Sequence, residues 1–182
     1  MSLKNTSNSY GSLAIALHWL MAVMIIALIF VGFTMGDMPD GAEKWEIYDM
    51  HKATGLVILT LALFRWYWML SNAKPNPVEG LSKAEIGISH ATKWILMLAM
   101  LAMPIAGIVM SLAGGHAINF YGLFTIDGFA EKNEALSHFA HEAHEMGAIV
   151  IALVIILHLL AALKHHFIKK DNTLNRMLGR NK

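Results

Sequence analysis

The sequence predicts an all-α integral membrane protein built as a four-helix bundle, and three observations support this expectation. Apolar residues make up 56% of the 182 residues. Only 15% of the residues are charged, against about 25% in typical soluble domains. The mean hydropathy is +0.50, and the apolar residues gather in long stretches. A water-soluble globule of this size could not bury so much apolar surface.

Each apolar stretch is long enough to cross the ~30 Å hydrocarbon core of a membrane as a helix. A spanning segment must satisfy its own backbone hydrogen bonds, so helices are the expected form. The first stretch is too long for the apolar part of a signal peptide, and no small-residue cleavage site follows it. The predicted helices cover about residues 12–35, 51–70, 89–114 and 142–168, within one domain of residues 1–182.

Polar and turn-forming residues separate the predicted helices, in the runs 36–41, 74–77 and 127–134. The polar tail after Lys169 contains a short helical signal, with Asp171 or Asn172 as its cap. Cysteine is absent, which excludes disulfides, iron–sulfur clusters, thiolate zinc sites and covalent haem attachment.

Charged residues divide between the two sides of the predicted membrane. The termini and the second connection hold 11 of the 14 basic residues: Lys4, Arg65, Lys74, Lys83, Lys93, Lys164, Lys169, Lys170, Arg176, Arg180 and Lys182. The other two connections hold 10 of the 13 acidic residues: Asp37, Asp40, Glu43, Glu46, Asp49, Asp127, Glu131, Glu134, Glu142 and Glu145. By the positive-inside rule, both termini face the cytoplasm. The acidic outer side follows from topology alone, or it repels anions and docks a basic partner.

Four of the ten histidines are expected at two levels, one near each membrane surface. His18 and His158 lie near the cytoplasmic ends of the first and fourth helices, whereas His51 and His144 open the second and fourth helices outside. Ionisable residues within a membrane are costly and indicate function. A small residue stands four positions after each of the four: Ala22, Gly55, Ala148 and Ala162.

The spacing of His144 and His158 places both on one face of the fourth helix. Their separation of 14 residues falls only about 40° short of four full turns, and it gives a rise of about 21 Å. His141 is the rival of His144, but it lies about 100° away from the face of His158.

Two separated histidine pairs do not form a tetrahedral zinc site, whereas imidazoles on both sides of a planar macrocycle form a bis-histidine haem. The predicted metal ligands are therefore His18 with His158 for an inner haem iron, and His51 with His144 for an outer haem iron. With both axial positions filled, we assign no catalytic residue. A methionine ligand remains open, as does a haem-free transporter that uses histidines as a proton relay.

Two further residues are candidates for cofactor binding. Arg65 follows His51 by 14 residues, so it points toward the cytoplasmic level, where it pairs with haem propionates or snorkels to the interface. His165 follows His158 by seven residues, and it holds a quinone or a haem propionate, or simply ends the helix at the interface.

An ordered set of motifs extends over nearly the whole chain, from Tyr10 to Leu178. It comprises LHWL at 17–20, DMHKATG at 49–55, MPIAG at 103–107, His144, LHLLAALKHHF at 157–167 and KDNTL at 170–174. This set resembles the bacterial cytochrome b561 family. The resemblance implies a four-helix protein of the bacterial inner membrane with two stacked b-type haems, the same ligand pairs, and ubiquinone or another quinone as substrate.

The resemblance implies transmembrane electron transfer between an outer-side donor or acceptor and the quinone pool, with Arg65 and His165 near the quinone. One branch consists of superoxide oxidases, which pass electrons from superoxide to quinone, although the acidic outer loops disfavour an anionic substrate. Another branch, indicated by residues 118–124, works beside a periplasmic redox or lipid- or quinone-binding protein. A haem-bearing anchor subunit for a peripheral redox enzyme is the alternative from another class. Membrane lipid is an expected partner and nucleic acid is not.

Overall fold

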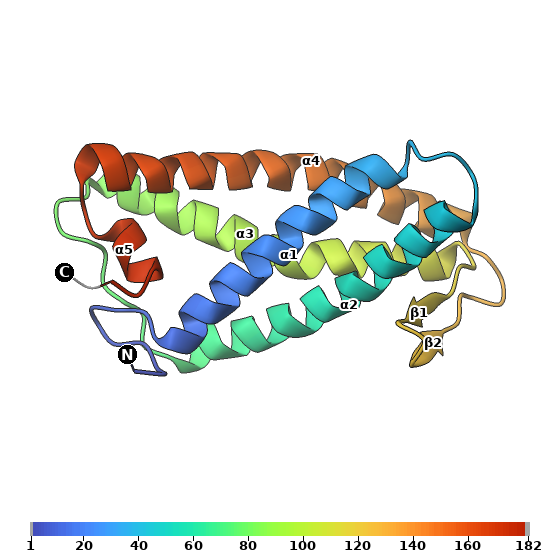
Figure 1. Cartoon of the computed structure of the whole chain (residues 1–182), viewed down its shortest axis with the longest axis horizontal. Coiled ribbons are helices and arrows are strands. Elements are labelled where there is room, and N and C mark those ends of the chain that lie inside the picture. Colours follow the sequence, from blue (N-terminus) through green and yellow to red (C-terminus); the bar gives the residue numbers. More distant parts are fainter. Residues whose placement is uncertain (1, 181–182) are drawn as a thin grey trace.

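The computed structural model describes residues 2–180. Its elements are α1 (Ser12–Met35), α2 (Ala42–Ser71), α3 (Lys83–Ala113), β1 (Ile118–Phe120), β2 (Phe124–Ile126), α4 (Glu134–Lys164), the π-helical turn η1 (His165–Lys169) and α5 (Thr173–Met177). The long helices run lengthwise through the molecule, and α1 crosses the bundle obliquely (Figure 1). The predicted domain of residues 1–182 includes Met1 and Lys182, which lie outside the described residues.

Four helical segments are long and apolar enough to cross a membrane: Ser12–Met35, Ala42–Ser71, Lys83–Ala113 and Glu134–Lys169. This confirms the predicted fold class, an all-α membrane bundle of four helices. Both ends of the described chain lie beside α5, and we call this the terminal end (Figure 1). The β1–β2 hairpin lies at the opposite end, which we call the hairpin end (Figure 1).

Three of the predicted helices start too late, whereas α1 matches its predicted bounds. The structure begins α2 at Ala42 rather than 51, α3 at Lys83 rather than 89, and α4 at Glu134 rather than 142. Local caps explain two of these early starts, because Ser82 and Glu85 form a capping box and Asn133 accepts from the Leu136 N–H at 3.0 Å. The first turns are polar, so hydropathy alone misses them.

The hairpin was not predicted from the sequence. β1 pairs antiparallel with β2, with Phe120 opposite Phe124. Tyr121 and Gly122 adopt positive φ angles of 50° and 76°, and the Asn119 side chain accepts from the Gly122 N–H at 2.7 Å. Ile118 is only 1% exposed, because β1 packs against α2 and α3.

The helices pack in chain order, with α1 on α2, α2 on α3, and α3 on α4. The centre of this packing is a cluster of Met21, Ile58 and Ala62, which are nearly inaccessible to solvent. Over residues 2–180, the backbone of α4 does not pack closely on α1 or on α2. The contacts of α4 with α1 and α2 are therefore made mostly by side chains.

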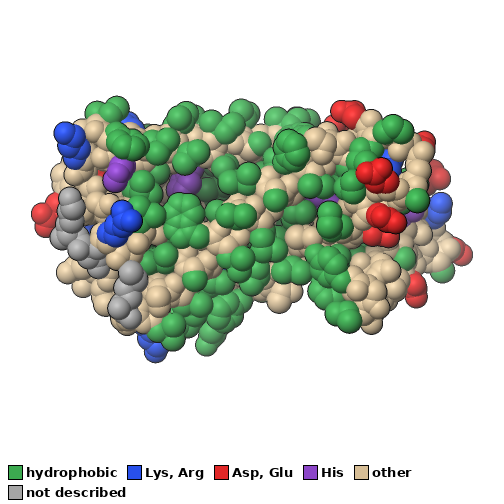
Figure 2. Space-filling view, viewed as in Figure 1, with side chains coloured by type: hydrophobic (Ala, Val, Ile, Leu, Met, Phe, Trp, Pro, Cys, Tyr) green, Lys and Arg blue, Asp and Glu red, His purple; other side chains and the backbone are tan. Residues whose placement is uncertain are grey.

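The two ends of the bundle differ in charge. Figure 2 shows lysine and arginine gathered at the terminal end, acidic side chains gathered at the hairpin end, and apolar side chains between them. Large apolar residues of this middle region are well exposed, for example Phe30 at 70% and Leu157 at 64%. Exposed apolar belts of this kind are typical of surfaces that face lipid.

The terminal end is closed by hydrogen bonds among segments far apart in the sequence. The Trp19 indole N–H donates to the Met177 carbonyl at 2.7 Å. The Arg176 guanidinium donates to the Asn76 carbonyl at 2.7 Å, and the Asn76 N–H donates to the Ser7 carbonyl at 2.8 Å. The N-terminal segment, the α2–α3 connection and α5 therefore form one cap.

Candidate metal centres and the terminal-end site

At the hairpin end, α2 and α4 bring two histidine rings face to edge. The ring centres of His51 and His144 are 6.2 Å apart and the ring planes are 74° apart. We call these two residues the hairpin-end pair.

At the terminal end, α1 and α4 bring together a second pair. The ring centres of His18 and His158 are 6.3 Å apart and the planes are 66° apart. We call these two residues the terminal-end pair. In each pair, a histidine of α4 lies opposite a histidine of α1 or α2, although the backbone of α4 does not pack closely on either helix.

The spacing within each pair fits a metal ion between two imidazoles. A bond of about 2 Å from metal to nitrogen, with about 1 Å more to the ring centre, separates two opposed ring centres by about 6 Å. The observed 6.2 Å and 6.3 Å agree with this arrangement. Within the described chain, no hydrogen bond joins the two rings of either pair. The spacing of each pair is therefore that expected for two axial ligands of a planar cofactor.

Neighbouring groups orient the rings of the hairpin-end pair. His144 Nδ1 lies 3.0 Å from the Met103 carbonyl oxygen, which as an acceptor fixes the proton on Nδ1 and leaves Nε2 free. His51 Nδ1 is buried without a hydrogen-bond partner in the part of the chain that the structure describes. A buried polar nitrogen of this kind is costly unless a ligand meets it.

Glycines let the helix backbones approach these rings. A Cβ atom on Gly107 would lie 3.3 Å from His144 Cε1, and one on Gly32 would lie 3.5 Å from His51 Cε1. Gly55, which the sequence analysis singled out, lines a cavity together with both rings and Ile118. A second cleft, with mainly apolar walls, lies on the other side of His51 between α1 and α2. The surroundings of this pair suit a flat apolar cofactor.

The structure pairs His51 with His144 and not with His141. His141 is exposed, and its Nε2 lies 3.7 Å from a Glu145 carboxylate oxygen. The exposed side chains of His141, Glu142 and Glu145 gather on the outside of α4.

Arg65 lies at the level of the terminal-end pair, where its charge acts on the rings of His18 and His158. Among residues 2–180, no carboxylate oxygen lies within 4.0 Å of its guanidinium. Burial raises the pKa of Tyr10, and the nearby positive charges of Arg176 and Arg65 oppose that rise. Arg65 therefore stands in a region of positive charge that suits an anionic ligand group.

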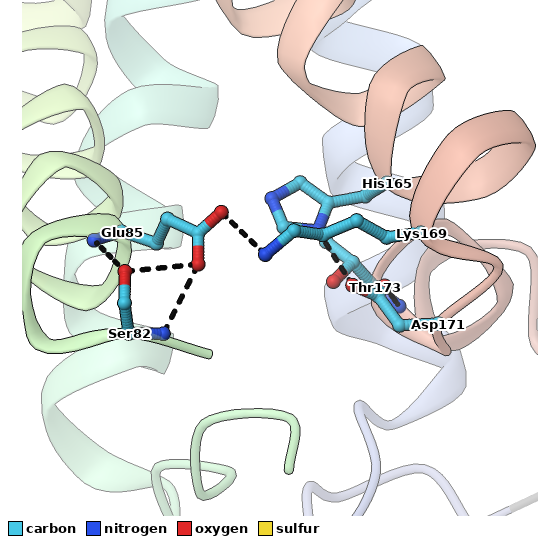
Figure 3. Close-up of polar contacts among 6 residues, drawn as sticks. All are labelled: Ser82, Glu85, His165, Lys169, Asp171 and Thr173. Carbon is cyan, nitrogen blue, oxygen red and sulfur yellow. Dashed lines mark hydrogen bonds and ion pairs between the residues drawn. The ribbon is translucent and has the colours of Figure 1, made fainter. Parts of the chain in front are cut away.

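His165 lies in η1 and contacts a residue that the sequence analysis treated only as a helix cap. Its Nδ1 is 2.6 Å from Asp171 Oδ2, and the two side chains are 15% and 13% exposed (Figure 3). Burial acts to raise the pKa of Asp171, but hydrogen bonds from Thr173 and His165 outweigh it and lower the pKa below its usual value. The described residues show no contact between His165 and Arg65.

Sequence reasoning missed three groups near these sites: the Met103 carbonyl, Gly32 and the Asp171 carboxylate. Every residue has a carbonyl, so no sequence signal marks the one at Met103. Gly32 and Gly107 did leave a signal, because glycine inside a helix costs stability and so needs a reason.

A four-helix bundle of membrane-spanning length, with paired histidines between its helices, is the architecture of a membrane-bound cytochrome. Residues 9–180 match the family model described as prokaryotic cytochrome b561, and the chain belongs to this family. The family transfers electrons within membranes with b-type haem, and the chain is a multi-pass bacterial membrane protein.

Relatives cover almost the whole chain. Cytochrome b561 homolog 2 of Escherichia coli (strain K12) is 31% identical over 182 residues, which are 99% of this chain and 96% of the relative. The probable superoxide oxidase CybB of Yersinia pestis is 31% identical over 169 residues, with 93% and 95% covered. Cytochrome b561 homolog 1 of the same E. coli strain is 27% identical over 177 residues, with 96% and 99% covered.

Proposed function

We propose that the protein holds two b-type haems and transfers electrons between its two ends. His18 and His158 would ligate the iron of the terminal-end haem, and His51 and His144 that of the hairpin-end haem. The main support for this proposal is the spacing of the ring centres, 6.3 Å in the terminal-end pair and 6.2 Å in the hairpin-end pair, which suits opposed axial ligands. The haem supplies one-electron chemistry, and the chain supplies position, low dielectric and charge.

The terminal end is assigned to the cytoplasm and the hairpin end to the periplasm of the inner membrane. The bias of basic residues to the terminal end supports this orientation. Arg65 would pair with haem propionates, because it is a half-buried cation with no carboxylate in contact among the described residues.

The electron partner at the terminal end is assigned as the quinone pool, in ubiquinone or another quinone. His165 supports this assignment, because it is half-buried at the terminal end and its Nε2 makes no hydrogen bond in the described chain. The partner at the hairpin end is an outer donor or acceptor, either a redox protein or a lipid- or quinone-binding protein of the periplasm.

Superoxide oxidation is the second candidate, and the name of the Yersinia pestis relative favours it. The acidic hairpin end opposes it, because superoxide is an anion and negative charge slows its approach. An anchor subunit for a peripheral redox enzyme is the third candidate, and a stable complex with a soluble subunit would favour it.

The test is the haem content of the detergent-purified protein, with visible spectra of the oxidised and dithionite-reduced forms. We expect two low-spin b haems per chain. One haem would mean that one pair is wrongly assigned, and no haem would favour a transporter with a histidine proton relay. Addition of superoxide to the oxidised protein then distinguishes the first two candidates, because only the second requires superoxide to reduce the haems.

A further inference from the structure

The Asp171–His165 pair is a partly buried acid–base pair that the axial ligation of haem leaves unused. It lies where the chain reverses after α4, because Lys170 adopts a left-handed conformation with φ 56°. This reversal returns the carboxylate of Asp171 onto the ring of His165, six residues back along the chain. The short Nδ1···Oδ2 distance of 2.6 Å is typical of a charge-assisted hydrogen bond.

Each oxygen of the Asp171 carboxylate has its own donor. Oδ1 accepts from the Thr173 N–H at 2.9 Å and Oδ2 accepts from His165 Nδ1 at 2.6 Å (Figure 3). A carboxylate can only accept, so the proton of the ring resides on Nδ1. In the neutral ring, the other nitrogen, Nε2, presents a lone pair on the side away from Asp171. An acid that fixes the tautomer of a histidine in this way makes it a defined proton acceptor.

A second ion pair on the same turn gives a contrast. Lys169 Nζ lies 2.5 Å from Glu85 Oε1, and Glu85 also accepts from Ser82, so this contact ties η1 to the first turn of α3 (Figure 3). It holds the helix ends together, and among the described residues Lys169 makes no hydrogen bond with His165. The Lys169–Glu85 pair is therefore a structural contact, whereas the Asp171–His165 pair sets the tautomer of a histidine.

We propose that Asp171 is a positioning residue that holds His165 as the proton acceptor for quinol at the terminal end. This inference rests on the proposed function, which places quinone there. Oxidation of one quinol to quinone releases two electrons and two protons. The haem that His18 and His158 would hold would accept these electrons one at a time. With each electron, Nε2 of His165 takes one proton from a quinol hydroxyl and returns it to water before the next.

The deciding variant is Asp171→Asn. One oxygen remains to accept from the Thr173 N–H, and the amide NH₂ then faces Nδ1 of His165 and donates to it. The ring proton moves to Nε2, which can no longer accept, as in the corresponding Asp→Asn change of a serine-protease triad. The fold around α5 is preserved, because its cap and the side-chain volume are retained.

The first readout is the ¹⁵N NMR spectrum of histidine-labelled holoprotein, in which the His165 signals are assigned by their loss in His165→Gln. We expect the ring proton on Nδ1 in the parent protein and on Nε2 in Asp171→Asn. Asp171→Glu, which keeps the negative charge, should restore the proton to Nδ1. An unchanged tautomer in Asp171→Asn would overturn the proposal.

The second readout is haem reduction by a short-chain ubiquinol, with the haem content of every variant measured first. We expect kcat to fall at least about tenfold in Asp171→Asn and in His165→Gln, with KM little changed. Lys169→Met removes the neighbouring ion pair and should leave both the rate and the tautomer unchanged. An equal loss in Lys169→Met, or full activity in Asp171→Asn, would show that Asp171 is structural only.

Failure of this proposal differs from failure of the proposed function. If dithionite reduces the haems of the parent protein, but ubiquinol does not reduce them and ubiquinone does not reoxidise them, the quinone assignment falls and this proposal falls with it. If ubiquinol reduces the parent protein and Asp171→Asn equally fast, only the role of Asp171 falls.

Discussion

The two histidine pairs have nearly the same spacing but different surroundings. At the hairpin end, the Met103 carbonyl fixes the His144 ring, and Gly107 lets the backbone of α3 lie against it. At the terminal end, the described chain shows no hydrogen bond to the ring of His18 or of His158. There the charge of Arg65 acts on both rings.

This difference teaches that one ligand geometry can be supported in two ways. The hairpin-end pair is oriented by backbone contacts, so its geometry should be sensitive to small changes of volume. The terminal-end pair lies beside a cation, so its redox properties should be sensitive to charge.

Removal of one ligand from either pair should remove one haem and leave the other in place. We expect His158→Ala to lose the terminal-end haem and His51→Ala to lose the hairpin-end haem, each retaining the other. The pyridine haemochrome assay would then give about one haem per chain in place of two. His141→Ala is the matched control, and loss of haem in that variant would contradict the choice of His144.

Removal of the cation should change the terminal-end haem only. In Arg65→Met, we expect its midpoint potential to fall by on the order of 50 mV, because a nearby positive charge favours the reduced haem. Spectroelectrochemical titration measures both potentials. Lys52→Met is the control near the hairpin-end pair, since the Lys52 ammonium is already paired with Asp49 at 2.6 Å. Equal shifts in both haems would contradict the comparison.

A methyl group added at Gly107 should be more destabilising than one added at Gly32, the other glycine beside the hairpin-end pair. Gly107→Ala places a methyl group 3.3 Å from His144 Cε1, tighter than ordinary contact, whereas Gly32→Ala places one at 3.5 Å from His51 Cε1. We expect Gly107→Ala to be less stable than Gly32→Ala by about 1 kcal/mol in thermal unfolding. The low-spin EPR signal of the hairpin-end haem should shift only in Gly107→Ala, and an identical response in both variants would contradict this.

The hairpin should add a small stabilisation without altering the haems. The Tyr121 hydroxyl lies 2.6 Å from Thr54 Oγ1, so Tyr121→Phe removes one hydrogen bond between the hairpin and α2. We expect a loss of about 1 kcal/mol and a fall in Tm of about 2 °C. Thr54→Val removes the same bond from the other side. The double variant should therefore lose no more than the larger single loss.

The sequence predicted the helices and the pairing of the histidines because both depend on periodicity. A spacing of 14 residues on α4 is enough to place His144 and His158 on one face, and the structure brings each ring next to its predicted partner. The haem-ligand role of the four histidines remains a prediction. The spacing of Arg65 from His51 was enough to predict its level in the membrane. It could not predict that no carboxylate lies near Arg65, because that depends on packing.

The early starts of α2, α3 and α4, the hairpin and the Asp171–His165 contact could not be predicted in the same way. The first turns of these helices are polar, so hydropathy does not distinguish them from loops. The contact of His165 with Asp171 depends on the left-handed conformation of Lys170, a residue type that rarely adopts it. Local geometry of this kind is set by tertiary packing rather than by pattern.

The loose backbone packing of α4 against α1 and α2 has a consequence for assembly in the cell. With the haems placed as proposed, the cofactors themselves join α4 to these two helices. A ligand that binds only the closed form stabilises it by mass action, so the supply of haem would set how much of the chain reaches that form. Chains made faster than haem is available would leave α4 held by α3 alone and become substrates for membrane proteases. The abundance of the protein would then follow iron and haem status without any dedicated regulator.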